Sequence, residues 1–253
     1  RERMGVTIAP ETWEASAQPP EPSKRVFVHR LFTTIAPRYD WFNRLASFSL
    51  DQRWRRRTID EAHLAPGLSV LDVCTGTGDL ALLCRKRVQP GGQVVGLDFN
   101  AAMLRGAAAK PKAQQTSVAW LQADAQALPF ASGTFDRVMI GFSTRNLSDL
   151  EAGLREMLRV LKPGGILLIL ETGRPTDPML RAGYFVFLQT VARAIGLVLT
   201  GRLWPFTYLA RSVKQFLSPE QFIRLREDCG ARARHVPLSG GLASLYVASK
   251  ANG

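Results

Sequence analysis

The stretch VLDVCTGTGDL, residues 70–80, decides the fold of this 253-residue chain. It begins as a largely apolar run of the β type and continues into a turn that carries Gly76 and Gly78. Such a turn lets the backbone approach a ligand closely and aims the N–H groups of the following helix toward it. Asp98, twenty residues after Gly78, ends the next apolar run, where its carboxylate can accept both hydroxyls of a ribose. The stretch therefore predicts a nucleotide-type site at the end of a strand.

On both sides of this stretch, short β-type runs alternate with helical ones. Strands are expected over residues 68–73, 93–98, 117–122, 135–140 and, after a Pro163-Gly164-Gly165 turn, 166–171, and helices over residues 79–87, 100–109 and 149–161. This alternation predicts an α/β fold, a parallel sheet with helices on both faces. Two last runs, residues 232–237 and 244–249, flank Ser239-Gly240-Gly241 and predict a closing antiparallel hairpin.

Three regions surround or interrupt the alternating part. Residues 1–23 carry four prolines among small and polar residues, which is typical of a flexible leader. Residues 24–67 are expected to form an N-terminal helical lid, with one helix ended by Pro37 and a second helical region, residues 41–63, broken near Ser47. The α/β domain then spans residues 68–253, with a helical insertion at about 177–217 that is expected to cap a substrate.

The formal charge of +12 raises the question of an anionic partner. Residues 177–253 hold 10 basic and 4 acidic side chains, a balance of +6, so half of the excess lies beside the most apolar run, Tyr184–Leu199. That run has 16 residues with Gln189 and Arg193 inside, which is short for a transmembrane helix. Basic and apolar residues together favour an anionic membrane surface over nucleic acid. A basic, solvated surface without a partner is the alternative. No metal-ligand spacing is found.

Two nucleotide cofactors compete for the glycine loop, because residues 76–81, GTGDLA, also satisfy the G-x-G-x-x-A dinucleotide pattern. Three features favour S-adenosylmethionine over NAD(P). First, 67 residues precede the first strand, whereas a dinucleotide domain usually starts close to it. Second, Asp72 is expected in the loop just before the glycines, where it would repel a pyrophosphate and attract the cationic end of S-adenosylmethionine. Third, Asp124-Ala125 ends the third strand and places a polar group near an adenine edge.

With these residues identified, the chain resembles the ubiquinone/menaquinone biosynthesis C-methyltransferases, within the class I methyltransferases, from about Lys24 to Lys250. The resemblance is carried by FTTIAPRYD at residues 32–40, by residues 72–80, by LKPGG at residues 161–165 and, most specifically, by GFSTRNL at residues 141–147. It implies a Rossmann-like, mostly parallel sheet of seven strands and S-adenosylmethionine as the cofactor. Cys74, Gly141, Ser143 and Thr144 depart from the family's pattern, which bears on the substrate more than on the reaction class.

The resemblance also implies a role for individual residues. The catalytic residues that it implies are Arg145, Asn146 and Tyr39. The cofactor-binding residues that it implies are Asp72, Gly76, Thr77, Gly78, Asp98, Asp124, Ala125, Gly141 and Tyr39. The substrate-binding residues that it implies are Asp40, Arg145, Asn146 and Tyr184. Because arginine is always protonated, Arg145 is expected to stabilise a ring phenolate and to polarise a water that carries the proton, while Asn146 orients that water or a ring oxygen. The alternative for Arg145 is a surface ion pair with Asp149, four residues on.

The implied substrate is a lipophilic quinol: a demethylmenaquinol, a demethylphylloquinol or a ubiquinol precursor. Such a substrate needs an apolar channel and access to a bilayer, so we expect peripheral contact with an anionic membrane on its cytoplasmic side, or in an organelle if the source is eukaryotic. The apolar insertion is also compatible with a homodimer surface. RWRRR at residues 53–57 is expected to be solvated or lipid-facing, not a nucleic-acid site.

Two other functions stay open from the residues alone. A small-molecule methyltransferase of secondary metabolism would use the same cofactor on a different substrate. A catalytically silent, membrane-associated scaffold would keep the fold without the chemistry. The intact set of site residues, from Asp72 to Asn146, argues against the scaffold.

Overall fold

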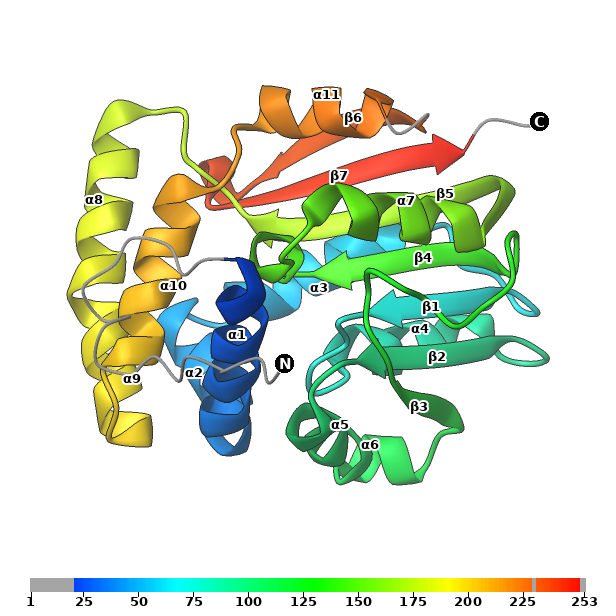
Figure 1. The fold of residues 1–253 in the computed structure, drawn as a ribbon, viewed down its shortest axis with the longest axis horizontal. Helices are drawn as coiled ribbons and strands as arrows, with labels where there is room; N and C mark the ends of the chain where they lie inside the picture. Colours follow the sequence, from blue (N-terminus) through cyan, green and yellow to red (C-terminus); the bar gives the residue numbers. More distant parts are fainter. Residues whose placement is uncertain (1–20, 229–230, 251–253) are drawn as a thin grey trace, which may run out of the picture.

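The computed structural model describes residues 21–228 and 231–250, which form a seven-stranded sheet of order β3-β2-β1-β4-β5-β7-β6 (Figure 1). The strands are β1 (Ser69–Val73), β2 (Gln93–Asp98), β3 (Val118–Gln122), β4 (Phe135–Gly141), β5 (Leu161–Thr172), β6 (Ala231–Leu238) and β7 (Ala243–Lys250). The first five strands pair in parallel, and β7 runs antiparallel to both β5 and β6. The predicted parallel sheet with a closing antiparallel hairpin is confirmed.

The central strands are apolar because helices cover both of their faces. Four of the five residues of β1 are buried, and β4 and β5 are buried along most of their length. The predicted strand limits agree within one residue except at the start of β5. The pairing shifts there from Phe135 opposite Leu161 to Arg137 opposite Ile166. The Pro-Gly-Gly segment is therefore an irregularity inside β5, and the prediction of a turn before the strand is wrong.

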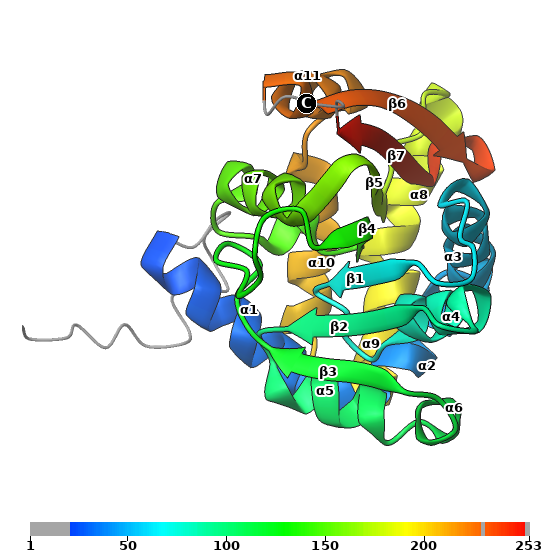
Figure 2. The same ribbon diagram turned by 90° about the vertical axis from the view of Figure 1, so that its right-hand side faces the viewer.

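Helices form a layer on each face of the sheet (Figure 2). α3 (Leu50–Glu61) and α4 (Asp79–Val88) bury Ile59, Ala81 and Cys84 against one face. α7 (Leu150–Val160) and α11 (Pro219–Asp228) bury Leu154, Met157 and Phe222 against the other. α5 (Ala101–Ala108) and α6 (Pro111–Gln114) lie near the β3 edge of the sheet.

The remaining helices gather beyond the carboxyl ends of β1, β4 and β5 and form a cap (Figure 1). They are α1 (Glu21–Ile35), the 3-10 turn η2 (Ala36–Arg38), α2 (Tyr39–Ala46), α8 (Pro178–Gln189), α9 (Val191–Thr200) and α10 (Trp204–Gln215). Phe42 of α2 and Phe206 of α10 lie with ring centroids 4.4 Å apart. A methyl group at Gly196 of α9 would lie 2.1 Å from the Phe206 ring, so α9 and α10 touch closely there. The N-terminal lid and the insertion, far apart in sequence, thus share one core.

Two sequence expectations concern the ends of this cap. The predicted leader falls on residues 1–23, of which residues 1–20 lie outside the described residues, and α1 already begins at Glu21. The apolar insertion forms two helices that meet at Thr190. In the described part of the chain, the stretch Pro178–Thr200 is long and apolar enough to cross a membrane; an 18-residue window within it has a mean hydropathy of 1.6, and 17% of that window is buried.

Candidate functional site

A cavity of about 810 Å³ opens where the strand order reverses between β1 and β4. In open α/β sheets this switch point is where ligands bind. The wall collects residues that follow four different strands: Cys74 to Thr77 after β1, Asp98 and Phe99 at the end of β2, Asp124 to Gln126 after β3, and Gly141, Ser143 and Asn146 from β4 onward. We call this space the cofactor cavity.

The glycine loop has the conformation that its sequence predicts. Gly76 and Gly78 have φ values of +56° and +80°, which favour glycine, and Gly78 caps the start of α4. Gly76 and Thr77 line the cofactor cavity, but Gly78 does not. A methyl group at Gly78 would lie 2.5 Å from the Trp120 ring, so this glycine lets β3 pack closely behind the loop.

Asp98 lies at the end of β2 and faces the cofactor cavity, as the sequence predicts. One carboxylate oxygen accepts a hydrogen bond from the Gly76 N–H (2.9 Å), and the other accepts one from the Asn100 N–H (2.9 Å). Burial raises the pKa of Asp98 to about 6, against the lowering effect of these hydrogen bonds. The remaining lone pairs are available to hydroxyl donors, which is what a ribose offers.

Asp72 is not where the sequence interpretation placed it. It lies within β1, not in the loop, and it is 1% exposed and absent from the cavity wall. Its Oδ2 accepts hydrogen bonds from the Thr75 hydroxyl (2.6 Å) and the Ala81 N–H (3.0 Å). Burial raises its pKa to about 7. Asp72 therefore fixes the loop to the start of α4 and does not line the cofactor cavity.

A second cavity, with an empty volume of about 920 Å³, adjoins the first. Phe32, Tyr39 and Asn146 belong to the walls of both. The cap supplies most of the second wall, including Phe42, Leu188, Phe206 and Leu209, so the lining is mainly apolar. Arg145 and Tyr184, both predicted to bind substrate, lie in this wall as well. We call it the substrate cavity.

Arg145 is held by a buried acid. It follows β4 in the 3-10 turn η3 (Thr144–Asn146), and its Nη1 donates to Glu171 at the end of β5 and to the Phe142 carbonyl (2.9 Å). Glu171 is 1% exposed and also accepts from the Thr144 hydroxyl (2.6 Å) and the Thr172 N–H (2.8 Å). The alternative of a surface ion pair between Arg145 and Asp149 is wrong, because Asp149 caps α7 instead.

Two buried donors at this turn have no hydrogen-bond partner: Nε of Arg145 and Nδ2 of Asn146. The other amide atom of Asn146 accepts a hydrogen bond from the Tyr208 hydroxyl (3.3 Å). An unpaired buried donor costs about 1–3 kcal/mol, so such a pair is expected where a ligand oxygen completes the site.

Three tyrosines surround this turn, and burial raises the pKa of Tyr39, Tyr184 and Tyr208, while the Arg145 charge lowers it in each. They therefore remain neutral hydroxyl groups at ordinary pH. Tyr39 lies between the two cavities, as its dual assignment to cofactor and catalysis requires.

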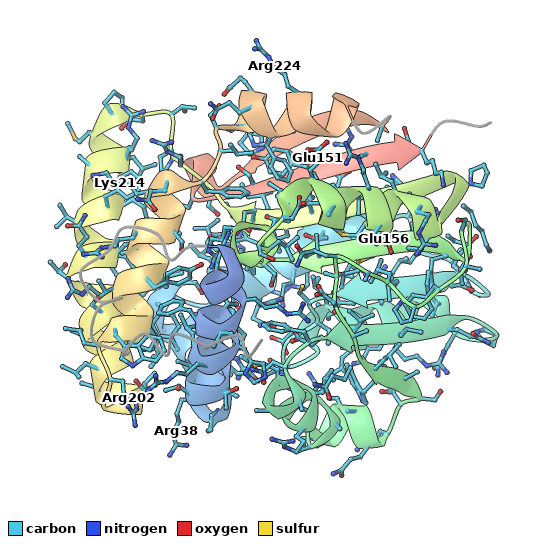
Figure 3. All side chains as sticks on the ribbon, viewed as in Figure 1. Arg38, Glu151, Glu156, Arg202, Lys214 and Arg224 are labelled. Carbon is cyan, nitrogen blue, oxygen red and sulfur yellow. The ribbon has the colours of Figure 1, made fainter. Side chains whose placement is uncertain are left out.

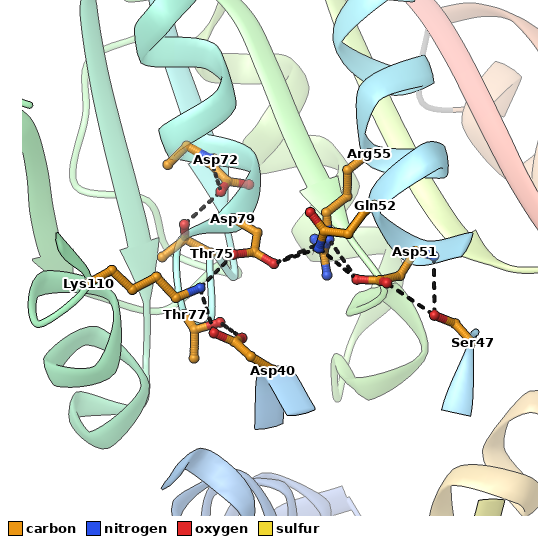
Figure 4. Close-up of polar contacts among 11 residues, drawn as sticks. Asp40, Ser47, Asp51, Gln52, Arg55, Asp72, Thr75, Thr77, Asp79 and Lys110 are labelled. Atoms are coloured by element: carbon orange, nitrogen blue, oxygen red, sulfur yellow. Dashed lines mark hydrogen bonds and ion pairs between the residues drawn. The ribbon is translucent and has the colours of Figure 1, made fainter. Parts of the chain in front are cut away.

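Asp40 lies in neither cavity wall. Its carboxylate pairs with Lys110 (2.7 Å) and accepts a hydrogen bond from the Thr77 hydroxyl (2.5 Å), as Figure 4 shows. Asp40 thus joins α2 of the lid to the glycine loop and does not reach the substrate cavity. At the other end of the cofactor cavity, Arg25 of α1 pairs with Asp124 (2.9 Å), and Ala125 follows in the wall.

Arg55 was missed by sequence interpretation, which took residues 53–57 as solvated or lipid-facing. Arg53 and Arg56 are exposed, but Arg55 is 7% exposed and lines the cofactor cavity. The available signal was the face of α3 that it shares with Asp51, Thr58 and Ile59, all of them buried. Lys110 was given no site role either, because its partners Asp40 and Asp79 come from distant segments. Glu171 was interpreted as a strand-end acid with a structural role, but its partner Arg145 was not foreseen.

These residues fit S-adenosylmethionine. The cofactor cavity offers a buried acid for the ribose at Asp98 and a second acid, Asp124, near the position of an adenine. At its other end lie Asp79 and the unpartnered Nε of Arg55, where the charged methionine group can be received. Among the described residues, no group of His, Cys, Asp and Glu side chains is arranged to hold a metal ion.

Solved structures show the fold. A SAM-dependent methyltransferase from Aquifex aeolicus aligns with a TM-score of 0.58 at 22% identity, over 77% of this chain and 88% of that one. The [4+2]-cyclase SpnF aligns with a TM-score of 0.61 at 20% identity, over 81% and 83% of the chains. The same architecture thus carries different activities, and sequence similarity must decide between them.

Sequence similarity is much higher to another set of proteins. The demethylmenaquinone methyltransferase of Thermus thermophilus is 42% identical over 220 residues, which are 87% of this chain and 100% of that protein. The ubiquinone/menaquinone biosynthesis C-methyltransferase UbiE of Syntrophotalea carbinolica is 41% identical over 85% of this chain and 91% of that protein. The model of the ubiE/COQ5 methyltransferase family matches residues 21–250. The predicted class I fold and the S-adenosylmethionine cofactor are confirmed, and the chain belongs to the ubiE/COQ5 methyltransferase family.

Proposed function

We propose that this protein transfers a methyl group to a ring carbon of a demethylated prenyl-quinol. The observation that carries the proposal is the apolar substrate cavity that shares Phe32, Tyr39 and Asn146 with the cofactor cavity. A ring placed at this shared wall has the cofactor cavity on one side and apolar space for a hydrocarbon tail on the other. The names of the relatives, demethylmenaquinone methyltransferase among them, support a quinol substrate.

The site residues account for the activation of such a ring. When bound, S-adenosylmethionine supplies a methyl group on a positively charged sulfur, which a nucleophilic carbon can displace. A quinol carbon becomes nucleophilic when a ring hydroxyl is deprotonated. Arg145, fixed by Glu171, and the free amide N–H of Asn146 stabilise the resulting phenolate oxygen. The hydroxyl proton leaves through a water that Arg145 polarises, because a guanidinium has no free base of its own. Once methylated, the ring carbon loses its own hydrogen as a proton to water, which makes the ring aromatic again. The oxygen regains a proton, so one proton is released for each methyl group transferred.

Methyl transfer from labelled S-adenosylmethionine tests this function. The substrates are demethylated naphthoquinols and benzoquinols with tails of different length, and phenols without a tail, under reducing conditions. We expect transfer to a prenyl-quinol, a large loss of turnover in Asn146→Ala with retained S-adenosylhomocysteine binding, and parent-like turnover in the exposed control Arg56→Ala. Transfer only to tailless phenols would point to secondary metabolism. Binding of S-adenosylhomocysteine without any transfer would point to a silent scaffold.

Peripheral membrane contact is part of the same proposal. The cap carries exposed apolar side chains, which we call the cap surface: Phe48, Met179, Leu180, Val186, Val191, Leu197 and Val198. Those on α8 and α9 recur at helix-face spacing, as in Met179–Val186 and Val191–Val198, and the Phe48 ring lies 5.8 Å from that of Phe187. The opposite face of α8 lines the substrate cavity with Tyr184 and Leu188. Only one helix layer therefore separates the cap surface from the tail of the proposed substrate.

Basic residues border the cap surface. Arg181, Arg202 and Lys214 are exposed, and Figure 3 shows Arg202 and Lys214 on the outer part of the cap. Each such charge near an anionic bilayer contributes about 1 kcal/mol. Residues 177–217, which include α8, α9 and α10, hold five basic side chains and one acidic side chain, which supports an anionic membrane as the partner.

Co-sedimentation with vesicles tests the contact. The parent is expected to bind vesicles with phosphatidylglycerol more tightly than pure phosphatidylcholine, and less tightly at high salt. Val198→Asp should weaken binding, whereas Ala131→Asp, an exposed position before β4, should not. Equal binding by both variants would contradict the proposal. A parent dimer in sedimentation velocity that Val198→Asp dissociates, without vesicle binding, would make the cap surface a homodimer interface.

A further inference from the structure

Arg55 is a buried cation with incomplete bonding. Its Nε lies 3.6 Å from Asp51 Oδ2 and 3.7 Å from Asp79 Oδ2, within ion-pair range but beyond good hydrogen-bond distance, and it has no hydrogen-bond partner. The guanidinium carbon lies 5.2 Å from the centre of the Phe142 ring. Figure 4 shows Arg55 between the two acids. Both carboxylates have hydrogen-bonding partners elsewhere.

Hydrogen bonds to other residues hold the carboxylates of Asp51 and Asp79 beyond hydrogen-bond distance from Arg55. Asp51 accepts hydrogen bonds from the Ser47 hydroxyl (3.0 Å) and the Gln52 amide (2.9 Å). Asp79 accepts from Lys110 Nζ (2.5 Å) and from the same Gln52 amide (3.2 Å). The two carboxylates thus balance the charge of Arg55 without forming a hydrogen bond to it. The N–H donors of its planar guanidinium group remain available for another acceptor.

The position of Arg55 in the cofactor cavity identifies that acceptor. Asp98 and Asp124 mark the adenosine end, and Arg55, Tyr39 and Asp79 lie in the wall with the glycine loop. A methyl group at Gly141 would lie 2.8 Å from Leu80 Cδ1 and 3.6 Å from Arg55 Nη1, so the guanidinium lies within contact distance of the end of β4. The only anionic group of S-adenosylmethionine is the carboxylate of its methionine moiety, and a carboxylate matches a guanidinium fork.

We propose that Arg55 is the residue that binds the carboxylate of the methionine moiety, with Asp79 facing the neighbouring ammonium group. The surrounding cluster has three acids, Asp40, Asp51 and Asp79, and two bases, Arg55 and Lys110. An amino-acid zwitterion adds one charge of each sign and leaves that balance unchanged. The proposal rests on one part of the proposed function, the binding of S-adenosylmethionine, and does not depend on the identity of the quinol.

Asp79 is suited to this part. Burial would raise its pKa, but the charges of Arg55 and Lys110 outweigh that effect and lower the pKa below its ordinary value. The carboxylate therefore stays ionised over the whole working pH range and can attract an ammonium group.

Calorimetry with two nucleosides tests the assignment without a quinol or turnover. S-adenosylhomocysteine carries the amino-acid group, and 5′-methylthioadenosine lacks it but keeps the adenosine and the sulfur. In Arg55→Gln, the affinity for S-adenosylhomocysteine should fall about 10- to 100-fold, the usual effect of one charged hydrogen-bonding partner, and that for methylthioadenosine less than about threefold. The exposed neighbour on the same helix, Arg56→Gln, should change neither affinity.

A second variant keeps the test valid if Arg55→Gln does not fold. Arg55→Lys keeps the charge but not the two-pronged donor, and it should weaken S-adenosylhomocysteine alone, by less than Arg55→Gln does. Equal losses for both nucleosides would make Arg55 a support of the whole cavity and overturn the proposal, as would an unchanged affinity for S-adenosylhomocysteine. Failure of quinol methylation alone, with these affinities as expected, would leave the proposal standing and refute only the substrate.

Discussion

Replacement of Glu171 by Gln is the most informative perturbation of the site, because it removes one charge and almost no volume. The side chain of Glu171 is 1% exposed and that of its partner Arg145 is 9% exposed. The carboxylate accepts from Thr144 and from the Arg145 N–H with one oxygen, and from Arg145 Nη1 and the Thr172 N–H with the other. In Glu171→Gln, an NH₂ group takes the place of one acceptor, and the Arg145 charge stays buried without its partner.

Breaking a buried ion pair from one side costs about 3–5 kcal/mol, which for a chain of this size lowers Tm by about 6–20 °C. Turnover should fall with it, because Arg145 no longer has a fixed orientation. Thermal denaturation followed by circular dichroism measures the stability, and calorimetry with S-adenosylhomocysteine checks that the cofactor cavity is intact.

The double variant Arg145→Met/Glu171→Gln separates the charge from the shape. It leaves no unpaired charge at this position, so it should recover about 1 kcal/mol or more relative to Glu171→Gln, yet remain inactive. A Glu171→Gln protein with parent stability, or a double variant less stable than Glu171→Gln, would refute the view that an unpaired buried cation dominates the effect. An active double variant would refute the role of Arg145.

Three further predictions follow from the same contacts. Affinity for S-adenosylhomocysteine should fall as the pH drops below about 6, the raised pKa of Asp98, because the ionised carboxylate accepts the ribose hydroxyls; calorimetry of Asp98→Asn should show a weaker and pH-independent affinity. Asp72→Asn should keep its bonds to Thr75 and Ala81 through one amide oxygen and should bind S-adenosylhomocysteine like the parent. Because the folded-state pKa of Asp72 is raised to about 7, ionisation of Asp72 destabilises the parent as the pH rises from about 4 to 7, so the Tm of Asp72→Asn should rise relative to the parent over that window. A tenfold loss of affinity for S-adenosylhomocysteine in this variant would instead show that Asp72 contributes to cofactor binding. Gly196→Ala should force α9 away from Phe206 and cost about 1–3 kcal/mol, measured by urea denaturation, whereas the exposed control Gly183→Ala should not destabilise.

Local sequence was enough for the parts of the site that follow strands. The carboxyl ends of β1, β2, β3 and β4 lie at one edge of a parallel sheet. The alternating pattern alone therefore predicts that the residues after these strands lie close together, namely Gly76, Asp98, Asp124 and Asn146. The same reasoning failed for Asp72, because a polar residue inside a strand can point to either face, and only the packing of α4 shows that its carboxylate serves Thr75 and Ala81.

The contacts of the lid residues Asp40 and Arg55, and the partner of Glu171, could be identified only from the tertiary structure. Asp40 and Arg55 lie on short helices whose rotation depends on their packing against the sheet, and their partners Lys110 and Asp79 come from other segments. Four of residues 53–57 are arginines, and this run alone does not distinguish Arg55 from its neighbours; only its spacing from Thr58 and Ile59 on α3 does. Glu171, in turn, is recognisable as a strand-end acid, but its partner Arg145 is 26 residues away.

By itself, the sequence determined the α/β fold, the glycine loop, the acid expected to bind the ribose (Asp98) and the family. These features depend on periodicity and on residues adjacent in the chain. Only the tertiary structure decided which charges are buried and paired: Arg145 with Glu171, Asp40 with Lys110, and Arg55 between two acids that do not close on it. The physical reason is that the energy of a charge depends on its burial and on its partners, and both are set by contacts between segments far apart in sequence.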